Sequence, residues 1–295
     1  MTSHRLRDVW AGNLQREFLA FQNTLRLAGK GAFVAIDTEF SGVLQEDAWK
    51  KSSDLHYLAM RESVDVFRPL QLGLAIGSQQ GQSLVAWNFN LRFDLQEDLY
   101  TDSAVQFLSG AGLDFQRHAT EGIDCGLLRA LLGGSELFAQ SSWLTFAGSY
   151  DLGYLLRLLS PSPLPAALEN FEALLDARCA ARVELRDALP FGSLASLAEE
   201  HGVLRRGCAH TAGSDALLTL DLFFRMKAPA GEVDVNDASE FKRKGDCTTN
   251  STPSAPTGPA RSSWGKAARL EMYSSAFVPS SLWGVAARSV ADARL

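Results

Sequence analysis

Two acidic residues follow a short apolar run at a spacing that suits metal binding. The run Phe33-Val34-Ala35-Ile36 is followed by Asp37 and, two residues later, by Glu39. Four successive apolar residues, aromatic or β-branched at the ends, predict a strand buried on both faces. Side chains two residues apart on a strand point to the same side, roughly 7 Å apart along the backbone. Two carboxylates so placed repel each other, and a hard divalent cation such as Mg²⁺ or Mn²⁺ would relieve that repulsion.

An Asp-x-Glu pair alone is more often the solvated end of a strand, so two further acids matter. Asp151 and Asp215 each fall in the first turn of a predicted helix, where the helix macrodipole favours a carboxylate whatever its role. Asp215 also lies five residues after His210. Four carboxylates in one pocket would bind two divalent ions about 3.5–4 Å apart, an arrangement that activates an attacking water in phosphodiester hydrolysis. With a usual pKa near ~6.5, the His210 imidazole can take the proton of that water.

The composition is that of a soluble globular protein. The chain has 295 residues, of which 46% are hydrophobic and 21% charged. No run approaches ~18 consecutive apolar residues and no secretion signal is apparent, so we expect an intracellular protein with no membrane partner. The four cysteines lie far apart without a Cys-x-x-Cys pair, so we expect neither a zinc knuckle nor a disulfide partner.

The net charge limits how the protein can bind nucleic acid. A formal charge of −6 weighs against a protein that grips long nucleic acid through its phosphates. It is compatible with an enzyme that holds a few nucleotides through metal ions, because bound divalent ions reverse the local field.

Apolar periodicity and turn residues predict alternating strands and helices up to about residue 228. Strands are expected over residues 33–40, 70–76, 83–89 and 142–146, with a weak strand at 175–179. Helices are expected over residues 8–27, within 46–68, and over 102–109, 123–132, 150–160, 166–174, 193–201 and 214–226. The second and third strands should form an antiparallel meander beside the first. Residues 1–228 are therefore expected to form one α/β domain.

Residues 229–295 differ from the rest of the chain. Thirteen of the sixteen residues from Thr248 to Ser263 are Ser, Thr, Pro, Gly or Asn. Such a segment cannot bury enough apolar surface to order itself, so we expect a largely disordered linker. The last thirty-odd residues carry Trp264, Tyr273, Phe277 and Trp283, which could form a short docking segment or no structure.

The order and spacing of three motifs resemble the DEDDh 3′-5′ exonucleases, and more narrowly the Caf/Pop deadenylases, the nuclease subunits of the Ccr–Not complex. The motifs are Ile36-Asp37-Thr38-Glu39-Phe40, then Ser149-Tyr150-Asp151-Leu152-Gly153-Tyr154-Leu155, then His210-Thr211-Ala212-Gly213-Ser214-Asp215. Supporting segments include Gln71-Leu72-Gly73-Leu74 and Trp87-Asn88-Phe89-Asn90. The similarity extends over about residues 7 to 227.

This resemblance implies an RNase H-like fold, with a central mixed sheet flanked by helices, and 3′-to-5′ hydrolysis of mRNA poly(A) tails that releases AMP. Asp37, Glu39, Asp151 and Asp215 would hold two divalent ions, Mg²⁺ or Mn²⁺, and His210 would be the general base. The implied partners are the 3′ end of single-stranded poly(A), a large Not-type scaffold subunit and a second deadenylase. The implied location is the cytoplasm, and also the nucleus.

Some features depart from the family or leave alternatives open. Ala147 stands where many relatives have a histidine, and Leu175-Asp176-Ala177-Arg178 where they tend to have Tyr-Asp-x-Lys. Phe40 and Tyr150, beside proposed ligands, are weak candidates for stacking on the terminal base, and core packing is the more common role for such residues. Two alternative functions remain: a catalytically silent adaptor of the same complex, and an exonuclease that trims other single-stranded RNA or DNA 3′ ends.

Overall fold

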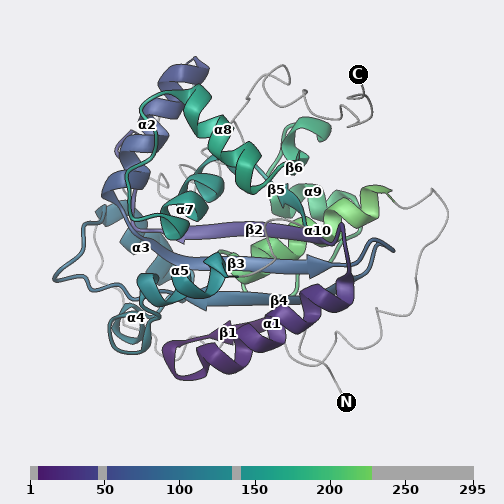
Figure 1. Ribbon diagram of the computed structural model, residues 1–295, viewed down its shortest axis with the longest axis horizontal. Helices are drawn as coiled ribbons and strands as arrows, with labels where there is room; N and C mark the ends of the chain where they lie inside the picture. The colour runs from purple at the N-terminus through teal and green to yellow at the C-terminus, as the bar shows by residue number, and fades with distance from the viewer. Residues whose placement is uncertain (1–5, 46–51, 135–140, 228–295) are drawn as a thin grey trace, which may run out of the picture.

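A six-stranded mixed sheet forms the centre of the protein. The computed structural model describes residues 6–45, 52–134 and 141–227. The strand order across the sheet is β1-β4-β3-β2-β5-β6. Its strands are β1 (Leu6–Val9), β2 (Phe33–Phe40), β3 (Pro69–Gly77), β4 (Ser83–Asn90), β5 (Ser142–Thr145) and β6 (Ala181–Glu184). The pairs β2–β3 and β3–β4 are antiparallel, whereas β1–β4, β2–β5 and β5–β6 are parallel. Figure 1 shows β3 running against its neighbours β2 and β4.

Helices connect the strands and cover the sheet (Figure 1). Those of the described residues are α1 (Leu14–Ala28), α2 (Ser53–Val66), α3 (Asp102–Gly110), α4 (Phe115–Glu121), α5 (Cys125–Gly133), α7 (Ser149–Leu159), α8 (Leu168–Arg178), α9 (Leu194–Glu200) and α10 (Ala212–Lys227). Short 3-10 turns lie at Ala11–Asn13 and Leu185–Ala188. None of the helices among these residues is long and apolar enough to cross a membrane.

The sheet separates two hydrophobic cores, and β2 contributes to both. Val34 and Ile36 belong to the larger core, with side chains from α1, α2, α5, α7 and α8. Ala35 belongs to the second core, with side chains from α9 and α10. Residues alternate between the faces of a strand, so Asp37 and Glu39 continue the face that α10 covers. The strand is therefore buried on both faces, as predicted.

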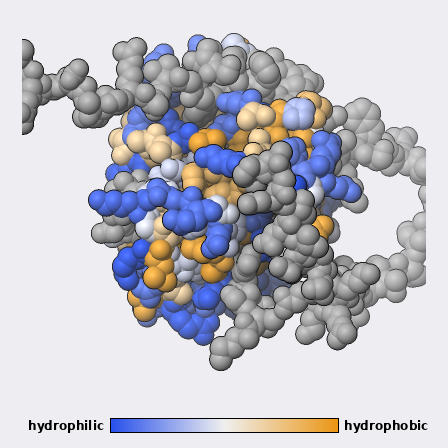
Figure 2. Space-filling model, turned by 90° about the vertical axis from the view of Figure 1, so that its right-hand side faces the viewer, coloured by the Kyte–Doolittle hydropathy of each residue, from blue (hydrophilic) through white to orange (hydrophobic). Residues whose placement is uncertain are grey.

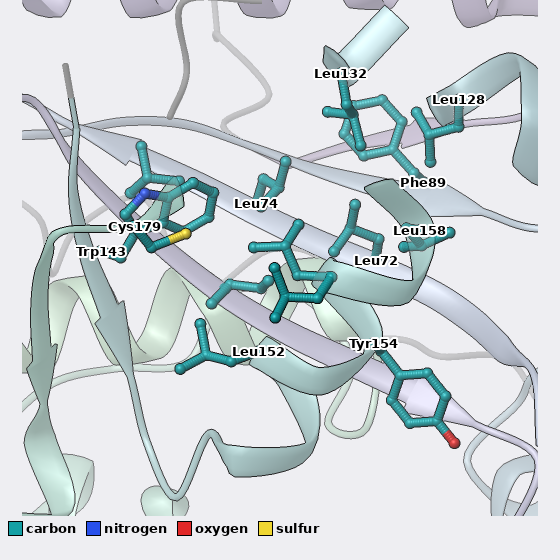
Figure 3. Close-up of a cluster of buried hydrophobic side chains, with 14 of the residues drawn as sticks. Leu72, Leu74, Phe89, Leu128, Leu132, Trp143, Leu152, Tyr154, Leu158 and Cys179 are labelled. Carbon is teal, nitrogen blue, oxygen red and sulfur yellow. The ribbon is translucent and has the colours of Figure 1, made fainter. Parts of the chain in front are cut away.

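The larger core packs leucine and aromatic side chains tightly against the sheet. Figure 3 shows Leu72, Leu74 and Phe89 of the meander beside Leu128, Leu132 and Leu158 of the covering helices, and Trp143 beside Cys179. The outer surface is different in character. On the face in Figure 2, hydrophilic and hydrophobic residues are interspersed, as on most globular proteins.

Most of the predicted elements are confirmed, including the meander and the helices that carry Asp151 and Asp215. The start of the first helix was predicted wrongly. Leu6–Val9 forms an edge strand that pairs with β4, and α1 begins only at Leu14. The Asn13 side chain explains the late start, because it accepts a hydrogen bond from the Trp10 N–H and donates one to the Asp8 carbonyl. The polar turn so formed separates the strand from the helix.

The weak strand expected at 175–179 is also wrong. These residues form the last turn of α8 and the residue after it, and the strand lies further on, at Ala181–Glu184. Leu175 is fully buried one helical turn after buried Phe171, so packing favours the helix there.

The short helix α4 was not predicted at all. The proposed tail, residues 229–295, lies outside the described residues.

Gly73 allows α10 to approach the sheet closely. It pairs with Asp37 across the β2–β3 ladder. A Cβ atom at position 73 would overlap the carbonyl group of Ala212, the first residue of α10. A glycine is therefore required for the N-terminus of α10 to lie beside the acidic end of β2.

We predict that Gly73→Ala destabilises the protein, because α10 must move away from the sheet. Overpacking of this kind costs roughly 3 kcal/mol of the free energy of unfolding. Urea denaturation of the full chain measures it. Gly133→Ala is the matched control, because a Cβ there meets no atom within 4 Å. Equal stability of Gly73→Ala and the wild type would contradict the inferred close approach.

Candidate active site

The two acids of β2, Asp37 and Glu39, lie beyond the point where the neighbouring strand β5 ends. Strand β5 pairs with β2 only from Phe33 to Ala35, so β2 continues past the end of β5. These two strands are parallel, and their carboxyl ends meet at the same edge of the sheet. Ligands bind preferentially at such edges in α/β proteins. Asp37 and Glu39 project at this edge.

Asp151 lies beside β2 just past the end of β5, where it contacts Thr38. Its Oδ1 atom accepts hydrogen bonds from the Thr38 N–H (2.8 Å) and the Thr38 hydroxyl (2.6 Å). Thr38 lies between the two acids of β2, so Asp151 is held directly against that segment. The Asp151 side chain is buried, and hydrogen bonds to an ionised carboxylate offset part of the cost of burying it.

A strained turn between β5 and α7 brings Asp151 to this position. Ala147 has a φ of 56°, in the left-handed region that residues other than glycine rarely adopt. The Glu184 carboxylate stabilises the turn by accepting hydrogen bonds from the Thr145 hydroxyl (2.8 Å) and from the N–H groups of Ala147 (2.8 Å) and Gly148 (3.0 Å). Ala147, where the resemblance leads us to expect a histidine, therefore lies in a tightly held loop at the site.

Side-chain amides of the meander hold the N-terminus of α10, which carries Asp215. The Ala212 N–H donates to Gln71 (3.2 Å) and the Gly213 N–H donates to Asn88 (3.1 Å). These are N–H groups that a helix leaves without intrahelical partners. The contacts fix the first turn of α10 against β3 and β4.

Glu39, His210 and Asp215 converge across the site. One potential ligand atom from each lies within 4.8 Å of the other two. Glu39 is fully buried, Asp215 is 7% exposed, and His210 is half-buried. His210 has a φ of 62°, and its ring meets the Phe107 ring of α3 edge-on at 4.7 Å between centroids. The imidazole therefore lies at the more exposed side of the acidic cluster.

The cluster fits a hard divalent cation. Glu39 and Asp215 offer carboxylate oxygens, the ligands that Mg²⁺ and Mn²⁺ prefer. The predicted ligands Asp37 and Asp151 are not in the group of atoms within 4.8 Å of one another, and Asp151 is joined to β2 through Thr38. Asp37 Oδ2, Glu39 Oε1 and Asp151 Oδ2 are each shielded from solvent. Several buried carboxylates in one place are costly unless positive charge accompanies them. One local cation is Arg205, whose Nη1 lies 2.8 Å from Asp215 Oδ1.

The structure places the two candidate base-stacking residues in a ring cluster. Phe40 is 8% exposed and stacks on Tyr150 at 5.4 Å and on Tyr154 at 4.8 Å between ring centroids. Burial raises the pKa of the Tyr150 hydroxyl, so it stays protonated at neutral pH. These contacts are sufficient to explain both residues as packing that supports the site. Stacking on a base stays a prediction.

Sequence reasoning assigned no positioning role to the residues that hold the candidate ligands in place: Thr38, Gln71, Asn88, Glu184 and Arg205. Gln71 and Asn88 carried a signal, because amides inside apolar strands need partners. Thr38, between the two acids, carried none that distinguishes it from an ordinary strand residue. Glu184 acts across 36 to 39 positions on residues 145–148. Arg205 lies only 9 positions before Ser214, in a loop whose path the local sequence pattern does not predict.

Comparisons with known proteins match this chain in sequence and in fold. A model of the CAF1 family ribonucleases matches residues 9–125. Poly(A) ribonuclease pop2 of Schizosaccharomyces pombe is 34% identical over 238 residues, which cover 76% of this chain and 69% of that protein. The solved structure of S. pombe Pop2p with Mg²⁺ and Mn²⁺ bound superposes with a TM-score of 0.71 at 33% identity, covering 77% of this chain and 93% of that one.

A second solved structure, of the yeast NOT1 MIF4G domain co-crystallised with CAF1, matches with a TM-score of 0.63 at 29% identity. It covers 75% of this chain and 88% of the matched chain. The architecture is that of the RNase H-like exonucleases, as the resemblance implied. The chain belongs to the CAF1 family of ribonucleases.

We predict that Thr38→Val lowers the free energy of unfolding, because the buried Asp151 carboxylate loses the 2.6 Å hydrogen bond from the Thr38 hydroxyl with little change in side-chain shape. Loss of a hydrogen bond to a buried charge costs roughly 1–3 kcal/mol. Thr38→Ser keeps the hydroxyl and should lose much less. Chemical denaturation at neutral pH compares the two variants. Equal losses in both would mean that methyl packing, and not the bond to Asp151, explains Thr38.

Proposed function

We propose that this protein is a metal-dependent 3′-to-5′ exoribonuclease that shortens mRNA poly(A) tails and releases AMP. The observation that carries the proposal is the convergence of acids from three separate segments with one imidazole. Glu39 and Asp215 lie together with His210, and Asp151 is bonded to the residue between Asp37 and Glu39. The preference for poly(A) is supported by the S. pombe relative, which is a poly(A) ribonuclease.

Each residue has a chemical role in this proposal. Asp37, Glu39, Asp151 and Asp215 would hold two divalent ions, Mg²⁺ or Mn²⁺, as supported by the ions in the S. pombe Pop2p structure. Such ions, when bound, stabilise the charge that develops on the attacking and leaving oxygens of a phosphodiester. His210 lies within reach of the cluster and is half-buried, so its imidazole can accept a proton from an attacking water and release it to solvent.

We further propose that the protein docks on a Not-type scaffold subunit together with a second deadenylase. This assembly would work in the cytoplasm and also in the nucleus. The scaffold proposal is supported by the yeast CAF1 structure, in which the partner is the NOT1 MIF4G domain.

We predict that the full chain co-elutes with a MIF4G domain in size-exclusion chromatography. Separate elution at micromolar concentrations of both would contradict the scaffold proposal and leave the catalytic proposal unaffected.

We predict that the purified chain shortens an A-tailed RNA from its 3′ end when Mg²⁺ or Mn²⁺ is present, and that EDTA stops the reaction. Asp37→Ala should abolish shortening because the site loses a proposed ligand. Asp102→Ala is the matched control, since Asp102 is an exposed acid in the first turn of α3. Gel analysis of end-labelled RNA measures the rate.

The outcomes separate the proposed function from its alternatives. Equal activity of Asp37→Ala and the wild type would contradict the assigned site. Binding of the MIF4G domain without any hydrolysis would identify an adaptor. Equal rates on A-, U- and C-tailed RNA, or on DNA, would identify a nuclease of broader substrate range.

A further inference from the structure

A single guanidinium joins the loop before α10 to the first turn of that helix. Arg205 lies between α9 and α10, and its Nη1 atom is 2.8 Å from Asp215 Oδ1. The same nitrogen donates to the Ser214 hydroxyl oxygen at 3.2 Å. The Ser214 hydroxyl in turn donates to the Arg206 carbonyl at 2.7 Å. These contacts fix the Asp215 side chain from outside the acidic cluster.

We propose that Arg205 is a positioning residue for Asp215, and that it raises the affinity of the site for a divalent cation. The inference rests on the proposed function, in which Asp215 is a ligand. A carboxylate has two oxygen atoms and about four acceptor positions, so the contact to Oδ1 leaves capacity for a cation. Asp215 contacts Arg205 through Oδ1. One of its carboxylate oxygens also lies within 4.8 Å of ligand atoms of Glu39 and His210.

Two effects of the guanidinium oppose each other. Its positive charge repels a bound cation, whereas its contacts with two adjacent side chains order the ligand before the cation arrives. Arg205 keeps one-fifth of its side chain exposed, so solvent screens part of the repulsion. The ordering effect is not screened in this way. Groups that hold a metal ligand in place typically contribute about ten- to hundredfold to metal affinity, and we expect ordering to dominate.

The neighbouring residue offers a matched control. Arg206 Nη2 lies 2.6 Å from Asp221 Oδ2, and Asp221 also belongs to α10. The exposed fractions of the arginine side chains are nearly equal, 20% for Arg205 and 22% for Arg206. Asp221 is not among the clustered ligand atoms. Asp221 Oδ1 also accepts a hydrogen bond from the Ser83 hydroxyl at the start of β4. Both pairs join an arginine to an aspartate of α10, and only the Arg205 pair includes a proposed ligand.

The experiment measures Mn²⁺ binding to the full chain by isothermal titration calorimetry, without RNA. We expect Arg205→Gln to weaken Mn²⁺ binding about tenfold or more, and Arg206→Gln to leave it within about twofold of wild type. Arg205→Lys keeps the charge but not the planar fork, so we expect an intermediate loss. In ribonuclease assays, Arg205→Gln should raise the Mn²⁺ concentration for half-maximal rate more than it lowers the rate at saturating Mn²⁺.

The outcomes distinguish the inference from the proposed function beneath it. No Mn²⁺ binding by the wild type would remove the proposed function itself. Normal or tighter binding by Arg205→Gln, with a wild type that binds, would overturn only the role of Arg205. An equal loss of Mn²⁺ affinity in Arg206→Gln would also overturn the role of Arg205, because it would show that any loss of an ion pair on α10 lowers the affinity. If Arg205→Gln does not fold, the comparison of Arg205→Lys with Arg206→Gln decides the question.

Discussion

Mutual repulsion among carboxylates is the constraint on which the rest of the structure depends. Asp37, Glu39, Asp151 and Asp215 come from three separate segments, and three of them are buried. Like charges in a site of low polarity are unfavourable unless the protein supplies compensating groups. Thr38 supplies an N–H and a hydroxyl to Asp151, and Arg205 supplies a guanidinium to Asp215. Both aspartates also lie in the first turn of a helix, where the macrodipole favours negative charge.

The sheet topology provides the space for this cluster. Strand β5 ends early, which leaves room for the N-terminus of α7 beside β2. On the other side of β2, Gly73 of β3 permits α10 to approach, and Gln71 and Asn88 fix its first turn. Two helix N-termini thus meet the same end of one strand. The apolar cores on the two faces of the sheet hold α7 and α10 in these positions.

The parts of the fold that could be predicted from the sequence are those with strong local signals. The apolar run before Asp37, the prolines after α7 and the periodicity of α10 each specify an element by themselves. Edge strands β1 and β6 are short and depend on pairing with distant segments, so local patterns were misread at Asp8 and at Leu175. The four acids became candidates through their combination, because three separate segments each place a carboxylate at the edge of an apolar element, and through the family resemblance. Their role as metal ligands stays a prediction. The residues that orient them could not be predicted, because their partners are up to 141 positions away, as for Ala212 and Gln71.

The most direct measurement of the central claim is anomalous X-ray diffraction from crystals of this protein grown with Mn²⁺. The account predicts anomalous density between the carboxylates of β2 and those of Asp151 and Asp215, at coordination distance from their oxygens. Density only at other positions, or none at millimolar Mn²⁺ with the four side chains ordered, would contradict it.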